Sequence, residues 1–165
     1  MRRATRVLLA AFGVVAMTLT LGSIAQSKEQ KMVHHAVGTF EVTMTPQDTS
    51  AGADGANPIA RFGLEKTFSG ALSGKAVGTM LSIGSPKPGA AASYVALDQF
   101  SGALAGKKGG FVLVHRGIMS KTGVSDLDIR IATDSGTGDL AGIAGSVKIE
   151  MRDGKHNYDL SYTLP

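Results

Sequence analysis

The chain has 165 residues, including 22 glycines and no cysteine, which is enough for one domain with its own hydrophobic core. Three of its 17 basic residues lie within the first 25, so the remainder is almost neutral against 13 acidic residues. This balance argues against a nucleic-acid-binding or anionic-membrane-binding surface, and the lack of cysteine excludes disulfides and a lipid anchor on an N-terminal cysteine.

The first predicted element is a secretion signal over residues 1–25. Its start is basic, residues 7–21 are apolar, and Ser23-Ile24-Ala25 offers the small residues between which signal peptidase cleaves. The apolar run is shorter than the ~20 residues that a membrane-spanning helix needs. We therefore expect a cleaved leader, a flexible segment over 26–36, no membrane association after cleavage, and a secreted or periplasmic protein.

From residue 37 onward, apolar and polar residues alternate, which is the period of a strand with one buried face. The eight predicted strands include residues 40–44, 62–68, 77–83, 94–104, 111–115, 127–131, 147–151 and 156–164, with a long polar loop over 46–58. Asp153-Gly154 predicts a two-residue hairpin turn that places Met151 opposite His156. Eight successive strands without a helix predict an all-β fold, a single eight-stranded up-and-down barrel over 37–165, with a two-sheet sandwich as the alternative.

An eight-residue phrase occurs twice, as FSGALSGK at 68–75 and FSGALAGK at 100–107. Neither copy has the spacing of a phosphate-binding loop, and no helix follows either one. With a looser copy, GDLAG at 138–142, the phrase marks three chain reversals that a meander places at the same end. It therefore predicts a closed rim. Lys75, Lys107 and Lys108 are expected in exposed turns, and a turn at Lys107-Lys108 would place Phe100 opposite His115.

Four segments have a distinctive composition: GTFEVTM at 38–44, SYVALDQFSGALAGKKGGFVLVHRG at 93–117, DSGTGDLAGIAGS at 134–146 and DGKHNYDLSYTLP at 153–165. Together they resemble a bacterial family of uncharacterised proteins catalogued as domain of unknown function 3224. The resemblance runs from about residue 37 to the end of the sequence. It implies an eight-stranded barrel similar to allene oxide cyclase, and it transfers no catalytic residue. The secretion signal is a departure from family members that begin close to the barrel.

Two charged residues are expected inside the barrel. Lys66 and Asp98 each lie two residues before the repeated phenylalanine, so both side chains should point inward at a similar depth. Burying either charge without a partner costs free energy. The sequence therefore predicts an interior Lys66–Asp98 ion pair, and the alternative is a β-bulge that turns Lys66 outward.

A second polar group is expected at the opposite rim. Tyr94, His115 and His156 should all face inward there, with Tyr158 one layer deeper. Such a ring could orient a small ligand or perform acid–base chemistry, because histidine titrates near neutral pH. The alternative interpretation is that neighbouring hydroxyl groups satisfy these histidines within a filled core.

Three functions are compatible with these patterns. The first is a secreted barrel that binds a small apolar or amphipathic molecule at the Tyr94, His115 and His156 end. The second is a small isomerase or cyclase that uses Asp98 or a histidine as its acid–base group. The third is an interaction module that forms a homo-oligomer, although the clearest outward sets, at 126–130 and 148–152, are charged. The spacing of the histidines does not predict a metal site. The serines do not occur in a motif that predicts a nucleophile, and no cofactor is expected.

Overall fold

The structure of the chain is a computed structural model that describes residues 31–165, apart from 51, 53, 55–56 and 85–88. The predicted secretion signal at 1–25 lies outside the described residues. The part of the chain that is described consists of strands and turns, and it contains no helix with the length and apolarity needed to cross a bilayer.

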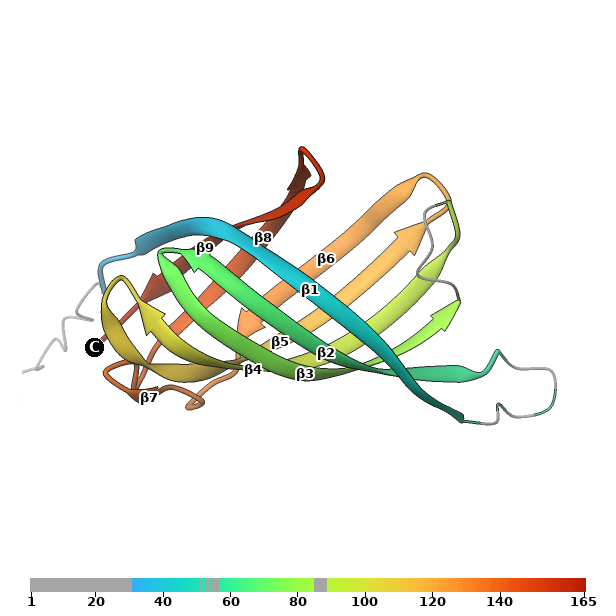
Figure 1. Cartoon of the computed structure of the whole chain (residues 1–165), viewed down its shortest axis with the longest axis horizontal. Coiled ribbons are helices and arrows are strands. Elements are labelled where there is room, and N and C mark those ends of the chain that lie inside the picture. The colour runs from blue at the N-terminus through green and yellow to red at the C-terminus, as the bar shows by residue number, and fades with distance from the viewer. Residues whose placement is uncertain (1–30, 51, 53, 55–56, 85–88) are drawn as a thin grey trace, which may run out of the picture.

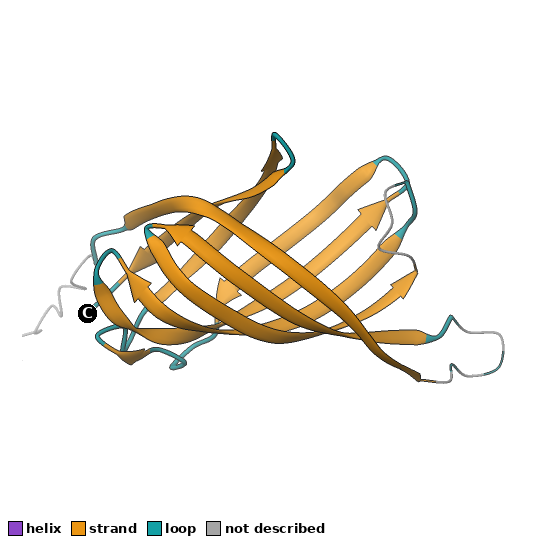
Figure 2. Cartoon of the chain, in the orientation of Figure 1, coloured by secondary structure: helices purple, strands orange, loops and turns teal. Residues whose placement is uncertain are grey.

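The strands form one closed sheet (Figures 1 and 2). Each long strand pairs antiparallel with the next, β4 pairs with β5, and β1 pairs with β9, so the predicted eight-stranded meander barrel is confirmed. A ninth, two-residue strand adds to β5. The strands are β1 (His34–Ser50), β2 (Ile59–Gly70), β3 (Leu72–Gly84), β4 (Ala92–Leu104), β5 (Lys107–Ser120), β6 (Gly123–Ile131), β7 (Thr137–Gly138), β8 (Ala144–Arg152) and β9 (Lys155–Thr163).

Aromatic side chains fill one half of the barrel. Phe68 lies between Phe40 and Phe100, with ring centroids 5.3 and 5.6 Å away, and Phe100 lies 5.0 Å from Phe111. Alternation along each strand sends these large side chains inward, where they are buried. The repeated phenylalanine of the two eight-residue phrases therefore belongs to the core.

The end of the barrel below this aromatic layer is sealed. Leu72 and Leu104 are buried there, and Leu140 and Ile143 from the segment after β7 pack into the same core. Backbone hydrogen bonds Leu140 N→Thr137 O and Ile143 N→Leu140 O fold that segment into successive turns. The predicted closed rim is confirmed, but residues 138–142 form a plug across it instead of a hairpin like the other two.

The opposite end is open and its wall is incomplete. β6 and β8 are adjacent, yet among the described residues they pair only through Arg130 and Ser146. Beyond that pair the β8–β9 hairpin turns away from β6, as Figure 1 shows. The open end thus has a gap in its ring of backbone hydrogen bonds.

Two predicted limits of the first strand are wrong. β1 begins at His34, where Ala36 is buried and His34 pairs with Tyr162, so residues 34–36 belong to the barrel. β1 also continues through Pro46 to Ser50, which pairs with Ile59 across a register shift between Pro46 and Thr49. Proline is tolerated at such an irregularity, and an exposed two-stranded extension accepts polar side chains that resemble a loop in the sequence.

The predicted register of the β4–β5 hairpin is also wrong. The turn is at Ala105-Gly106, with φ of 48° and 85°, so Phe100 lies opposite Phe111. A two-residue turn of this kind needs positive φ at both positions, which only Gly106 signals in the sequence. Lys107 and Lys108 begin β5, and likewise Lys75 lies within β3 instead of a turn. The predicted Met151–His156 pairing is confirmed.

Candidate functional site

The open half of the barrel contains a cavity of about 320 Å³. Its walls come from the inward faces of all eight long strands, and most of the surrounding side chains are apolar. The apolar lining is Phe40, Val42, Met44, Leu64, Met80, Ala92, Ala96, Met119, Leu127, Ile149 and Met151. The polar lining is Lys66, Ser82, Tyr94, His115 and His156.

The predicted interior ion pair lies beneath this cavity. The Nζ atom of Lys66 donates to Oδ2 of Asp98 at 2.5 Å, although β2 and β4 are separated by β3. Nε2 of His115 lies 2.9 Å from the same carboxylate oxygen. Asp98 is fully buried, and Lys66 and His115 are almost as deep. The confirmed pair is thus a triad in which one carboxylate joins a lysine and a histidine.

Small neighbours make room for the carboxylate. Gly78 lies opposite Asp98 in the β3–β4 register, and a Cβ atom on Gly78 would approach Asp98 Oδ1 to 2.2 Å. Oδ1 itself is buried and has no hydrogen-bond partner among the described residues. His115 Nε2 also lacks a well-aligned hydrogen bond, and so does Ser82 Oγ on the cavity wall. Unpaired buried polar atoms are rare in folded proteins. Asp98 does not line the cavity and His115 Nε2 is close to Asp98, so Ser82 Oγ is the atom of these three that offers a free polar position in the cavity wall.

The charge state of Asp98 follows from opposing effects. Burial raises the pKa of the carboxyl group, while the contacts with His115 and Lys66 lower it, and the contacts prevail, so the pKa lies below its usual value of 3.8. The carboxylate is therefore ionised at neutral pH. Its contribution to the free energy of unfolding is present above the unfolded-state pKa and is lost as the pH falls through the folded-state pKa.

Tyr94 stands on the wall between the triad and the open end. Its pKa is raised, first by burial and then by the negative charge of Asp98, so the phenol keeps its proton and can donate a hydrogen bond. The ring occupies space left by Gly117 on β5, where a Cβ atom would approach the ring to 2.2 Å. The orientation of Tyr94 therefore depends on glycine at 117.

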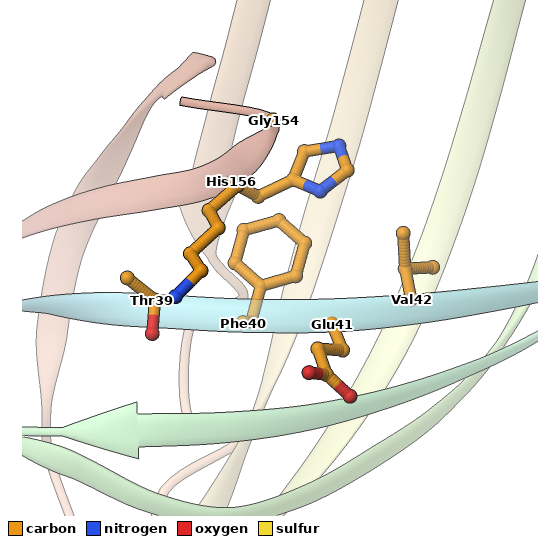
Figure 3. Close-up of a pocket in the computed structure, with 7 residues that line it drawn as sticks. Thr39, Phe40, Glu41, Val42, Gly154 and His156 are labelled. Atoms are coloured by element: carbon orange, nitrogen blue, oxygen red, sulfur yellow. The ribbon is translucent and has the colours of Figure 1, made fainter. Parts of the chain in front are cut away.

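His156 lies at the side of the cavity nearest the β8–β9 hairpin. Its ring stacks on Phe40 with centroids 4.8 Å apart, and Figure 3 shows the two rings side by side. The Nζ atom of Lys66 lies 5.4 Å from the centroid of the same Phe40 ring. Phe40 and His156 line both the cavity and a surface hollow of about 340 Å³ beside Gly154, so this stack separates the interior from solvent.

We expect His156 to titrate below its usual pKa of 6.5, because burial and then the charge of Lys66 disfavour the imidazolium. Since the folded state then binds fewer protons than the unfolded state, stability falls as the pH drops below 6.5. NMR titration of the imidazole measures the midpoint. In Phe40→Ala, which removes the apolar cover, the midpoint should move back toward 6.5. A wild-type midpoint at or above that value would contradict the assignment.

Tyr158 lies apart from this group. Its hydroxyl group accepts a hydrogen bond from Leu72 N at 2.7 Å and donates to Ser69 O at 3.3 Å, both beside the closed end. It does not line the cavity. The pKa of Tyr158 is raised by burial, against a lowering effect of the Leu72 N–H. The structure thus assigns Tyr158 to holding the β2–β3 turn.

The structure therefore brings together Lys66, Tyr94, His115 and His156 around one cavity, with Asp98 directly beneath. His115 lies deeper than predicted, against Asp98 instead of at the rim. The sequence interpretation missed Ser82, although alternation from Met80 places it on the inward face. It also missed Phe40 as the ring that joins Lys66 and His156. Among the described residues, no three His, Asp or Glu side chains are grouped so that they could hold a metal ion.

Comparison with known proteins identifies the family. The sequence matches the family described as protein of unknown function, DUF3224, over residues 36–162. A crystal structure of a DUF3224 protein of unknown function from Shewanella oneidensis MR-1 is similar, with 36% sequence identity and a TM-score of 0.73. The alignment covers 81% of this chain and 99% of that one. A search of curated proteins gives no match. The chain therefore belongs to the DUF3224 family.

Proposed function

We propose that this protein is an exported binding protein that holds one small apolar or amphipathic molecule in the open half of its barrel. The observation that carries the proposal is the unpaired Ser82 Oγ in the wall of an otherwise mainly apolar cavity. Eight-stranded barrels either fill their interior with side chains or hold one small ligand. In this barrel the phenylalanines fill only one half, and about 320 Å³ remains in the other. That volume is at the lower end of the range for ligand sites.

The lining indicates the chemistry of the ligand. Apolar walls favour a hydrocarbon or ring portion, because removing such a surface from water is favourable. Ser82 can donate or accept a hydrogen bond, Tyr94 can donate one, and Lys66 lies at the cavity floor. The negative charge of Asp98 already offsets the positive charge of Lys66. A ligand with one uncharged oxygen function, such as a hydroxyl or carbonyl group, therefore fits better than a strongly charged one.

Two neighbouring positions on β4 test the location of binding. Ala96 points into the cavity, whereas Leu97 is outward and 55% exposed. We expect Ala96→Leu, which fills cavity volume, to weaken binding of a neutral naphthalene-based fluorescent probe at least about tenfold, since each 1.4 kcal/mol of lost binding free energy corresponds to that factor. Leu97→Lys should leave probe affinity unchanged. Fluorescence titration measures both.

The reverse pattern, with affinity lost in Leu97→Lys and kept in Ala96→Leu, would place the probe on the outer surface and contradict the proposal. Thermal unfolding of each variant shows that the fold is retained. Overpacking a core costs typically about 1–3 kcal/mol, so Ala96→Leu should remain folded at room temperature. If it does not, Ser82→Ala serves instead, since it removes the polar atom without adding volume.

A second candidate function is acid–base catalysis, as in a small isomerase. The observation in its favour is that Asp98 contacts both Lys66 and His115 within hydrogen-bonding distance of one oxygen. Such coupled groups shift protons between defined positions, and clusters of this kind are frequent at catalytic sites. Asp98 itself does not line the cavity, so Lys66 and His115 would be the groups that meet a substrate.

A further inference from the structure

The outer face of the barrel carries a broad apolar surface, in contrast with the charged outward positions expected from the sequence. Leu97 and Val77 are each 55% exposed and Val95 is 53% exposed. We define the outer patch as the outward side chains Val77, Leu81, Val95, Leu97, Val114 and Ile118, on β3, β4 and β5. The charged set on β6 borders the patch, with Arg130 opposite Val114 and Asp126 opposite Ile118, and the set on β8 lies further round the barrel wall.

These side chains form one continuous surface. The strand registers place Leu81 opposite Val95 and Leu97 opposite Val114. Ile118 lies beyond Arg116 on the same face of β5, and Arg116 pairs with Asp126 on β6. β3, β4 and β5 are consecutive in the wall (Figure 1), and the patch side chains are 40–55% exposed, so no other described element covers them. The patch is therefore a bare apolar sheet surface and not a set of scattered exposures.

We propose that a second copy of this chain covers the outer patch, so that the barrels associate as a twofold dimer. The apolar side chains of the patch present on the order of 600 Å², which is as large as the largest patch on a typical monomer. With a polar margin this approaches the roughly 800 Å² per partner of a standard stable interface. A twofold interface uses the same surface on both copies, so no further surface is required.

The charges at the β2 margin fit such an axis, and at the β6 margin Arg130, which continues the central row, is already paired with Asp128. Gly63, Thr79, Leu97 and Val114 lie in one row across β2 to β5. On β2, Arg61 lies two residues before this row and Glu65 two residues after it, and both are exposed. A twofold axis along the row brings Arg61 of each copy opposite Glu65 of the other. Neither residue forms an ion pair with any other described residue.

The shape of the patch agrees with the same axis. Leu81, Val95 and Ile118, together with Arg116, line a shallow hollow of about 390 Å³ on the side of the row nearer the open end. Val77 stands on the other side of the row, and its neighbour across the axis is Leu81 of the second copy. Each copy thus offers a projecting side chain and a hollow that receives one.

Sedimentation equilibrium of the protein isolated from the cells that make it tests the proposal. We expect the wild type to be a dimer and Leu97→Lys to be a monomer. In the variant, association should be weakened at least about 100-fold, because both copies lose a central contact. Val37→Lys makes a similar change at a 61% exposed position on β1 and should stay dimeric. Arg61→Glu should weaken association, and adding Glu65→Arg should restore it, because the opposite charges face each other again.

A wild-type monomer at the highest soluble concentration overturns the proposal, and so does a dimer that Leu97→Lys leaves intact. A wild-type monomer that floats with phosphatidylcholine vesicles would assign the patch to a lipid surface. If Leu97→Lys does not fold, as judged by circular dichroism, the Arg61 and Glu65 exchange decides the matter. These results are independent of whether the interior cavity binds a ligand.

Discussion

Replacing Asp98 by asparagine should lower the free energy of unfolding by about 3–5 kcal/mol, because it leaves the buried Lys66 ammonium without its partner. Lys66 is 8% exposed, so water cannot take the place of the carboxylate without a change in the barrel wall. Chemical denaturation of the variant and the wild type measures the loss. The same change removes the negative charge beside His115 Nε2 as well.

A matched control exists on the surface. Asp126 pairs with Arg116 at 2.7 Å, but both side chains are about half exposed. Asp126→Asn should therefore cost no more than about 1 kcal/mol, as exposed ion pairs contribute little. Lys66→Met combined with Asp98→Leu should recover most of the stability lost in Asp98→Asn, because it removes both buried charges. A loss below about 1 kcal/mol in Asp98→Asn would show that the triad is not a buried, water-excluded group.

Replacing Leu140 by alanine should lower the free energy of unfolding by about 2–5 kcal/mol, because the side chain is fully buried in the plug that seals the closed end. The loss combines transfer of the side chain to water with the cavity that remains. Denaturation measures this effect too. Since the plug packs against the core and not against the ligand cavity, probe binding at the open end should be unchanged.

Val37→Ala serves as the comparison for Leu140→Ala. Val37 is 61% exposed, so its truncation should change stability by no more than about 0.5 kcal/mol. Equal losses in the two variants would mean that the plug containing Leu140 does not seal the barrel. A loss of probe binding in Leu140→Ala would mean that the two ends of the interior are not independent.

The features that were predicted correctly depend on local rules. Alternation by two sends Lys66 and Asp98 inward, and the matching position of each before a repeated phenylalanine places them at one depth. The Asp153-Gly154 turn sets the β8–β9 register, because both residues adopt the positive φ that such a turn requires. Short-range sequence patterns therefore suffice for the strand number, the inward face and the central ion pair.

The features that were missed depend on properties that alternation does not encode. The β4–β5 turn uses Ala105 at positive φ, which is unusual for alanine, whereas the sequence favours the more polar Lys107-Lys108 pair as the turn. The error moved Phe100 by four residues along β5, an even number, so the inward face was still correct. His115 reaches Asp98 because neighbouring strands of a barrel are staggered. This stagger sets how deep each side chain lies along the barrel axis, and alternation along a strand does not reveal it.

The outer patch was missed for a similar reason. Val95, Leu97 and Val114 are outward residues on strands whose inward positions are also apolar, so these strands do not show a clear alternation of polar and apolar residues. A continuous apolar run usually indicates a strand buried on both faces. In this barrel nothing among the described residues covers the outer face, which is why the patch became visible only with the strand registers.

The central claim is that the open half of the barrel holds one small molecule, and native mass spectrometry of the protein isolated from its own cells tests it most directly. The proposal predicts one releasable small molecule per chain, on a chain that lacks residues 1–25. The molecule should be lost in Ala96→Leu and retained in Leu97→Lys. A wild-type chain that carries no molecule, or one whose bound molecule survives Ala96→Leu, would contradict it.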